Sequence, residues 1–223
     1  MDIDYSLIEN EYNIDLRNEA LFVDLEEALD HGVLVSKLAA LVAEELGEDE
    51  TFIHDMKVAG LVHDVGKMKL GDYLYGRAAD SLKVEEMKYV RMHSEFSYDI
   101  LKSLGYNDNI LVSVYHHHEN YDGSGYPGNM KGDDIPLGAR ILRVCDVYSA
   151  LCSDRPYRTA FPPEVVMDLM IDEVKNFDMK VFLALQRVVH SDEFEEIRTF
   201  IEQANLAVRK DKEEKLKNDN TKA

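Results

Sequence analysis

The chain is predicted to be an all-α protein that folds as one compact helical bundle. Apolar residues recur at the helical period along nearly all of its 223 residues, and no convincing alternating strand pattern is present. No internal repeat and no Pro- or Ser-rich linker divides the chain. One hydrophobic core shared by packed helices accounts for such a pattern.

The helices are read in order from this periodicity. In 31–47, Leu34, Leu38 and Leu41 lie on one face, and Gly47 is suited to end the helix. Pro136 stands near the start of the fifth helix, where its missing N–H costs least. The remaining ranges are 49–67, ended by Gly66, then 82–105, 108–119, 135–152, 162–174, 178–189 and 192–210.

The chain ends differ from this pattern. Residues 1–20 are expected to form an accessory segment, residues 21–209 the main domain, and residues 210–223 a charged, disordered tail without an apolar stripe. Fewer than 30 residues precede Glu27, so we expect no N-terminal sensor domain.

Composition narrows the function classes. The net charge of −19 argues against nucleic acid polymers and anionic membranes as partners, although a small anionic substrate stays open if metal ions reverse the local field. No apolar run is long enough to span a bilayer, and the acidic N-terminus lacks signal-peptide order. Cys145 and Cys152 stand too far apart on one helix to bridge, which predicts core thiols and a reducing, cytoplasmic location.

Several histidines and carboxylates occupy helix positions that the apolar pattern around them predicts to be buried. A bundle can gather such side chains into a metal site, and this many imidazoles without a thiolate suits two or more ions, with Fe or Mn favoured and Zn also compatible. Asp64 is placed to bridge two ions, and Lys67 to neutralise a phosphate oxygen, which predicts metal-assisted phosphoester hydrolysis. The candidate ligands are Glu27, His31, His63, Asp64, His93, His117, His118 and Asp146.

These motifs resemble the HD phosphohydrolase superfamily. "HDVGK" over 63–67, with His31 upstream and Asp146 downstream, is similar to its metal-binding pattern. "HHENYDGSGYP" over 117–127 and "DRPYR" over 154–158 resemble the HD-GYP branch. The resemblance implies an HD-type helical bundle.

The resemblance also implies an activity. HD-GYP proteins hydrolyse cyclic di-GMP to pGpG or GMP through hydroxide bound to two or three metal ions, usually Fe and sometimes Mn. The resemblance implies that the eight candidate residues are metal ligands, with Glu27 typical of trinuclear members, and that Asp64 and Lys67 are catalytic. By the same resemblance the substrate is held by Lys67, Gly125, Tyr126, Pro127, Arg155 and Arg158.

Several alternatives stay open. One alternative is an HD phosphohydrolase that acts on another cyclic dinucleotide or on a nucleotide. A second is a catalytically silent sensor of the messenger, and the retention of every ligand position argues against it. His116 matches no ligand position, and Glu119 either orients a ligand imidazole or is a cap or surface charge. A homodimer or a regulatory protein partner is compatible with the sequence.

Overall fold

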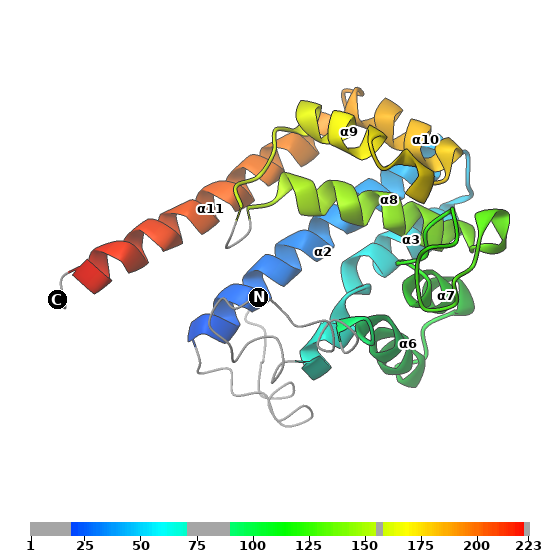
Figure 1. Ribbon diagram of the computed structural model, residues 1–223, viewed down its shortest axis with the longest axis horizontal. Helices are drawn as coiled ribbons and strands as arrows, with labels where there is room; N and C mark the ends of the chain where they lie inside the picture. Colours follow the sequence, from blue (N-terminus) through cyan, green and yellow to red (C-terminus); the bar gives the residue numbers. More distant parts are fainter. Residues whose placement is uncertain (1–18, 71–89, 155–157, 221–223) are drawn as a thin grey trace.

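The computed structural model describes residues 19–70, 90–154 and 158–220 (Figure 1). Within these ranges the chain forms helices joined by turns and contains no β-strand, so the all-α prediction is confirmed. The elements are α2 (Glu19–Glu45), α3 (Glu50–Val62), η1 (Val65–Leu70), α6 (His93–Ser103), α7 (Asp108–Tyr115), η2 (Gly132–Asp134), α8 (Leu137–Cys152), α9 (Pro163–Ile171), η3 (Val174–Asn176), α10 (Met179–Val189) and α11 (Phe194–Asn220).

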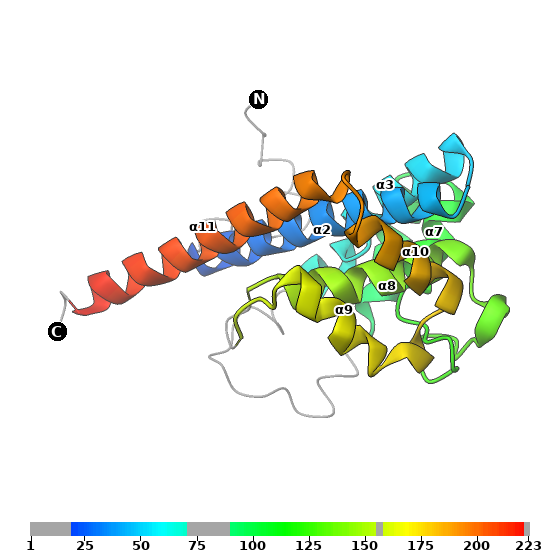
Figure 2. The ribbon, with the colours of Figure 1, turned by 90° about the horizontal axis from the view of Figure 1, so that it is seen from above.

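Helix α2 lies at the centre of the bundle. It packs against α3, α8, α10 and α11, and α8 in turn contacts α3, α7, α9 and α10 (Figures 1 and 2). The apolar stripe predicted for α2 supplies fully buried core residues such as Leu38 and Val42. Tyr148 of α8 meets Phe194 of α11 with 6.2 Å between ring centroids, in an edge-on arrangement that favours aromatic pairs.

Two helices end earlier than the sequence predicted. Helix α3 stops at Val62, before Gly66, and α7 stops at Tyr115, before the histidine run. His63 and Asp64 therefore lie in the turn between α3 and η1, and the histidine run lies in the turn after α7. Ends of helices leave carbonyl groups without intrahelical partners, and these carbonyls become important below.

The two longest helices extend past their predicted limits. Helix α2 begins at Glu19 and so crosses the expected boundary after residue 20, and α11 continues to Asn220 through the segment expected to be disordered (Figure 2). That segment is rich in Glu, Lys and Leu, which have high helix propensity without needing a packed face. Residues 1–18 and 71–89 lie outside the described ranges.

Two further expectations can be compared with the described residues. Cys145 and Cys152 are both buried and unbridged, as predicted. No helix in the described ranges has the length and apolar character needed to cross a bilayer.

A buried carboxylate connects α3 to the start of α7. Asp55 is 2% exposed, and its two oxygens accept hydrogen bonds from the side-chain amides of Asn107 at 2.8 Å and Asn109 at 3.1 Å. Asn107 also caps α7, because its Oδ1 accepts from the backbone N–H of Ile110. The contact thus sets the position of the helix that leads into His117 and His118.

Asp55→Ala is expected to lower the free energy of unfolding by about 1–3 kcal/mol, because two amides lose their acceptor inside the protein. Urea denaturation measures the change. Asp192→Ala, which removes an exposed carboxylate, is the matched control and should alter stability by less than about 0.5 kcal/mol. Equal effects of the two substitutions would contradict a structural role for Asp55.

Candidate metal centre

Seven of the predicted ligands meet inside the bundle although they come from five separate parts of the chain. His31 belongs to α2, His63 and Asp64 follow α3, His93 opens α6, and Asp146 lies on α8. His117 and His118 stand in the turn after α7. The eighth, Glu27, lies on α2 one turn before His31, and its side chain is outside the described part.

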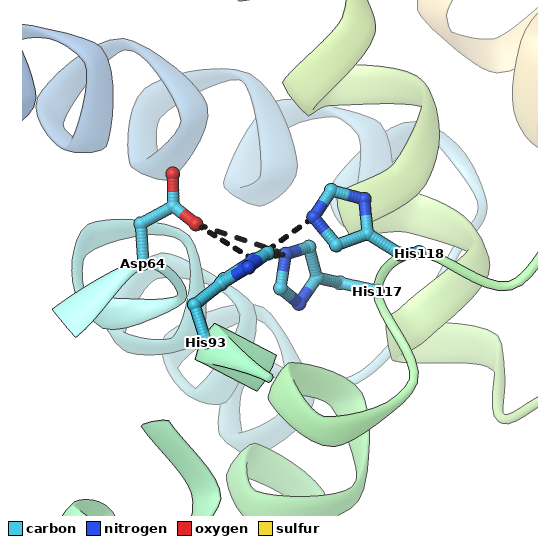
Figure 3. Close-up of side chains that lie close together, drawn as sticks. All are labelled: Asp64, His93, His117 and His118. Atoms are coloured by element: carbon cyan, nitrogen blue, oxygen red, sulfur yellow. Dashed lines mark hydrogen bonds and ion pairs between the residues drawn. The ribbon is translucent and has the colours of Figure 1, made fainter. Parts of the chain in front are cut away.

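The ligand atoms form two groups that share one residue. In the first group, Asp64, His93, His117 and His118 offer atoms that all lie within 4.8 Å of one another (Figure 3). In the second group, His31, His63 and Asp64 do the same. The shared carboxylate is the one that the sequence predicted to bridge two ions.

Asp64 directs one oxygen to each group. Its Oδ1 lies 3.2 Å from Nε2 of His93 and 3.9 Å from Nε2 of His117. Its Oδ2 lies 3.3 Å from Nε2 of His63 and 2.5 Å from Nζ of Lys67. A carboxylate with its oxygens divided in this way is suited to bridge a pair of cations.

Three imidazole rings are oriented by the same backbone contact. Nδ1 of His63, His93 and His117 lies 2.8, 2.6 and 2.6 Å from the carbonyl oxygens of Gly60, Val90 and Val114, in each case three residues earlier. Because a carbonyl can only accept, Nδ1 carries the proton and Nε2 keeps its lone pair. All three Nε2 atoms are thereby prepared as metal ligands.

These lone pairs face each other at close range. Nε2 of His93 lies 3.3 Å from Nε2 of His117 and 2.9 Å from Nε2 of His118. At His93 and His117, whose Nδ1 atoms carry the protons, the two Nε2 lone pairs repel each other, and a cation between them would remove the repulsion. Nε2 of His63 and Oδ1 of Asp64 are buried without a hydrogen-bond partner in the described part of the chain, so the donor set fits a metal ion.

Asp146 joins the second group. Its Oδ1 lies 3.0 Å from Nε2 of His31 and 3.8 Å from Nε2 of His63. Nδ1 of His31, in contrast with the three rings above, has no hydrogen-bond partner among the described residues. The hydrogen bond to Asp146 is therefore what orients this ring.

Nearby positive charges and hydrogen bonds keep the two carboxylates ionised, and burial keeps two of the imidazoles neutral. Burial raises the pKa of Asp64, but the charges of Lys67 and His63 hold that pKa well below its usual range. Burial likewise raises the pKa of Asp146, which the hydrogen bond and charge of His31 outweigh. Burial lowers the pKa of His118 to about 3 and lowers the pKa of His117 well below its usual value. Both protonation states suit metal binding, because ligands must be deprotonated.

Gly66 explains how Asp64 reaches His93. A Cβ atom at Gly66 would lie 2.1 Å from the carbonyl oxygen of His93 and 2.5 Å from the backbone nitrogen of Ser97. The backbone N–H of Gly66 donates to Oγ of Ser97 at 2.8 Å. Only glycine lets η1 press directly on the first turn of α6.

The glycine-rich turn is fastened to the histidines through Glu119. Glu119 is 2% exposed, its Oε1 accepts from the N–H of Gly128 at 2.5 Å, and its Oε2 accepts from the N–H of Met130 at 3.1 Å. Neither alternative weighed for Glu119 is correct, since it holds the backbone of the turn. The signal available in the sequence was its position directly after the ligand histidines and before the turn.

The turn brings Tyr126 onto a ligand. The rings of Tyr126 and His118 are stacked, with centroids 4.7 Å apart and planes at 28°. A Cβ atom at Gly125 would lie 2.2 Å from the backbone nitrogen of Asn120, so this position also requires glycine. His116 contacts Tyr115 and lies 3.5 Å from Glu119, outside both ligand groups.

The remaining substrate candidates differ in their surroundings. Lys67 lies at the centre, on Asp64. Arg158 donates to the carbonyl oxygens of Ala150 and Leu151, at 2.8 and 3.2 Å, and so closes the end of α8. Arg155 lies outside the described residues.

Comparison with known proteins gives a consistent family. The family described as HD domain matches residues 10–181. Relatives include the cyclic di-GMP phosphodiesterase response regulator RpfG of Xanthomonas campestris, 35% identical over 69% of this chain and 41% of that protein. A cyclic di-GMP phosphodiesterase of Pseudomonas aeruginosa is 34% identical over 71% of this chain and 38% of that protein. The chain thus spans about two fifths of the length of these relatives.

Solved structures support the fold. The cyclic GMP-AMP specific phosphodiesterase of Vibrio cholerae matches with a TM-score of 0.59 and 15% identity, over 83% of this chain and 53% of that one. The HDG"Y"P protein of Bdellovibrio bacteriovorus matches with a TM-score of 0.60 and 18% identity, over 81% of this chain and 60% of that one. At these identities the likeness concerns the arrangement of helices.

Gly66→Ala is expected to reduce the number of metal ions bound per chain, because the added methyl group pushes η1, and with it Asp64, away from His93. Overpacking of this kind costs about 1–3 kcal/mol of stability. Elemental analysis after incubation with Mn²⁺ measures the bound metal. Gly105→Ala is the control for a glycine substitution that strains the backbone without a steric clash. Gly105 has a φ of +80°, which is unfavourable for alanine, but no atom lies within 4 Å of an added Cβ. Full metal content in Gly66→Ala would contradict the assignment.

Glu119→Gln is expected to speed amide hydrogen exchange at Gly128 and Met130 about tenfold or more, since the glutamine amide turns a donor toward one of these N–H groups. Mass spectrometry of the peptide covering 125–131 measures the exchange. Glu202→Gln, at an exposed position of α11, should leave exchange in this peptide unchanged. Unaltered exchange in Glu119→Gln would show that the turn is held by other contacts.

Proposed function

The chain belongs to the HD domain family, and from this premise we propose that it is a metal-dependent phosphodiesterase that hydrolyses cyclic di-GMP to pGpG, GMP or both. The relatives named as cyclic di-GMP phosphodiesterases support this substrate. The Gly-Tyr-Pro turn at Gly125, Tyr126 and Pro127 supports placement in the HD-GYP branch.

One observation carries the proposal. Two groups of buried donors share Asp64, and each oxygen of that carboxylate faces one group. When bound there, two metal ions, Fe or Mn by the donor chemistry, acidify a water molecule and withdraw charge from a phosphoryl group. A silent sensor needs no such shared arrangement.

The residues of the chain divide the remaining work. His93, His117 and His118 would hold one metal ion, His31, His63 and Asp146 would hold the other, and Asp64 would offer one oxygen to each. Lys67 keeps Asp64 ionised and stands where a non-bridging phosphate oxygen is neutralised. Tyr126 positions the dinucleotide beside His118. Roles for Glu27, Arg155 and Arg158 remain predictions.

A second substrate is favoured by a specific observation. A relative from Vibrio cholerae named as a 3′3′-cGAMP-specific phosphodiesterase is 29% identical over 72% of this chain, and another is 32% identical over 70%. The proposal therefore extends to cyclic dinucleotides as a class, with cyclic di-GMP first. The third ion, the cytoplasmic location and a homodimer or regulatory partner stay predictions.

Purified protein loaded with Fe or Mn under anaerobic conditions is expected to hydrolyse cyclic di-GMP faster than 3′3′-cGAMP and cyclic di-AMP. The products are separated by chromatography, and metal is counted by elemental analysis. We expect at least two ions per chain, because two donor groups are present. Hydrolysis of none of the three dinucleotides by metal-loaded protein would refute the proposed function.

Asp64→Asn in the same assay is expected to lower kcat/KM by more than about 100-fold. That figure is the upper end of the losses seen when a residue that only hydrogen-bonds to a metal ligand is replaced. Asp192→Asn is the matched control at an exposed position. Circular dichroism checks that both variants keep the helical fold. Retained turnover in Asp64→Asn would remove the bridging carboxylate from the mechanism.

A further inference from the structure

Two arginines border the candidate metal centre without belonging to it. Arg91 lies two residues before His93, and Arg143 lies on α8, one turn before Asp146. Neither belongs to the predicted site residues. Arg91 is exposed, whereas Arg143 is partly buried.

Their contacts aim both guanidinium groups at the glycine-rich turn. Cζ of Arg91 lies over the ring of Tyr126, 5.2 Å from its centroid. Nε of Arg143 donates to Oδ1 of Asn120 at 2.9 Å, and its Cζ lies 6.0 Å from the ring centroid of Phe177. Asn120 follows His118 by two residues, so Arg143 is held against the segment that carries the ligands.

One short stretch of backbone links both arginines to the candidate ligand His118. Tyr126, the ring under Arg91, stacks on His118 with centroids 4.7 Å apart. Asn120, the hydrogen-bond partner of Arg143, lies two residues after the same histidine.

The pairing of charges elsewhere makes these two arginines unusual. In a chain of net charge −19, four of the other five arginines of the described part pair with carboxylates, and the fifth, Arg158, donates to backbone carbonyl groups. Arg91 and Arg143 form no ion pair with a carboxylate within the described residues, and the terminal nitrogens of Arg143 donate no hydrogen bond there. The contrasting pairs are Arg140 with Asp133 and Asp178, Arg187 with Glu45, Arg198 with Glu195, and Arg209 with Asp154.

We propose that Arg91, which lies over the ring of Tyr126, and Arg143, which is held by Asn120, form a subsite for a second phosphate group of the substrate. The inference rests on the proposed function, because a cyclic dinucleotide carries two phosphodiester groups and only one is cleaved at a time. The planar guanidinium fork matches two phosphate oxygens, and its charge offsets the acidic field of the protein. The subsite selects dinucleotides over substrates with one phosphate.

The test compares two substrates that differ in their number of phosphates. Cyclic di-GMP has two, and bis(p-nitrophenyl) phosphate has one, so the second reports on the metal centre alone. Arg143→Gln is expected to raise KM for cyclic di-GMP about tenfold or more, the effect of one charge-assisted hydrogen bond. Its loss in kcat/KM should be at least about ten times larger for cyclic di-GMP than for the simple diester. Arg91→Gln should show the same pattern with a smaller rise, because Arg91 is exposed.

Control variants distinguish a loss of substrate binding from a loss of folding, and a second dinucleotide distinguishes recognition of the phosphates from recognition of the bases. Arg187→Gln removes an equal charge from α10 and should leave both substrates within twofold of the unaltered protein. Arg143→Lys keeps the charge without the fork and should recover part of the affinity. Cyclic di-AMP is tested as a competitive inhibitor, and its inhibition constant should rise as much as KM for cyclic di-GMP, since its phosphates are the same and its bases differ.

The outcomes distinguish this inference from the proposed function. If the unaltered protein cleaves cyclic di-GMP and neither glutamine variant changes KM by more than twofold, the subsite is refuted and the function stands. Equal losses on both substrates, or a loss for cyclic di-GMP with none for cyclic di-AMP, also refute the phosphate subsite. Cleavage of the simple diester alone by the unaltered protein refutes the proposed function, and the subsite with it.

Discussion

The hydrogen bond from an imidazole Nδ1–H to the carbonyl three residues earlier is the contact on which the candidate centre depends. It recurs at His63 and His117, just after the C-terminal ends of α3 and α7, where carbonyls lack helical partners, and at His93, the first residue of α6. One contact satisfies the backbone, selects the tautomer and aims Nε2 inward. Bound cations would relieve the repulsion between these lone pairs, and metal binding would then stabilise the fold.

The sequence was sufficient for the helices and for the seven donors that gather in the candidate centre, since charged residues within apolar stripes are costly unless they serve a site. The sequence was less informative about helix ends. Gly66 was predicted to end a helix, whereas in the structure it allows η1 to approach α6 closely. Glu119 was ambiguous for a similar reason. Its partners are backbone N–H groups of the turn, which no side-chain pattern reveals. Arg143 was missed because an arginine in a helix usually reads as a solvated charge.

Charge in this protein is organised at short range. The overall field is negative, and most described arginines are neutralised by carboxylates that hold helices together, as Arg209 and Asp154 do between α11 and the end of α8. At the centre the balance reverses, since Asp64 and Asp146 face imidazoles, Lys67 and, near Tyr126, two arginines. An acidic protein therefore contains a centre that would suit an anionic ligand once metal is present.

The stacking of Tyr126 on His118 has an evolutionary consequence. Under the proposed function, Tyr126 would contact the substrate and His118 would bind the metal, and a single short stretch of backbone carries both rings. A substitution that retunes substrate preference in this stretch also disturbs an ion, so the two properties cannot drift independently. Divergence among such proteins should then accumulate at peripheral positions such as that of Arg143, where selectivity changes while the catalytic ions stay in place.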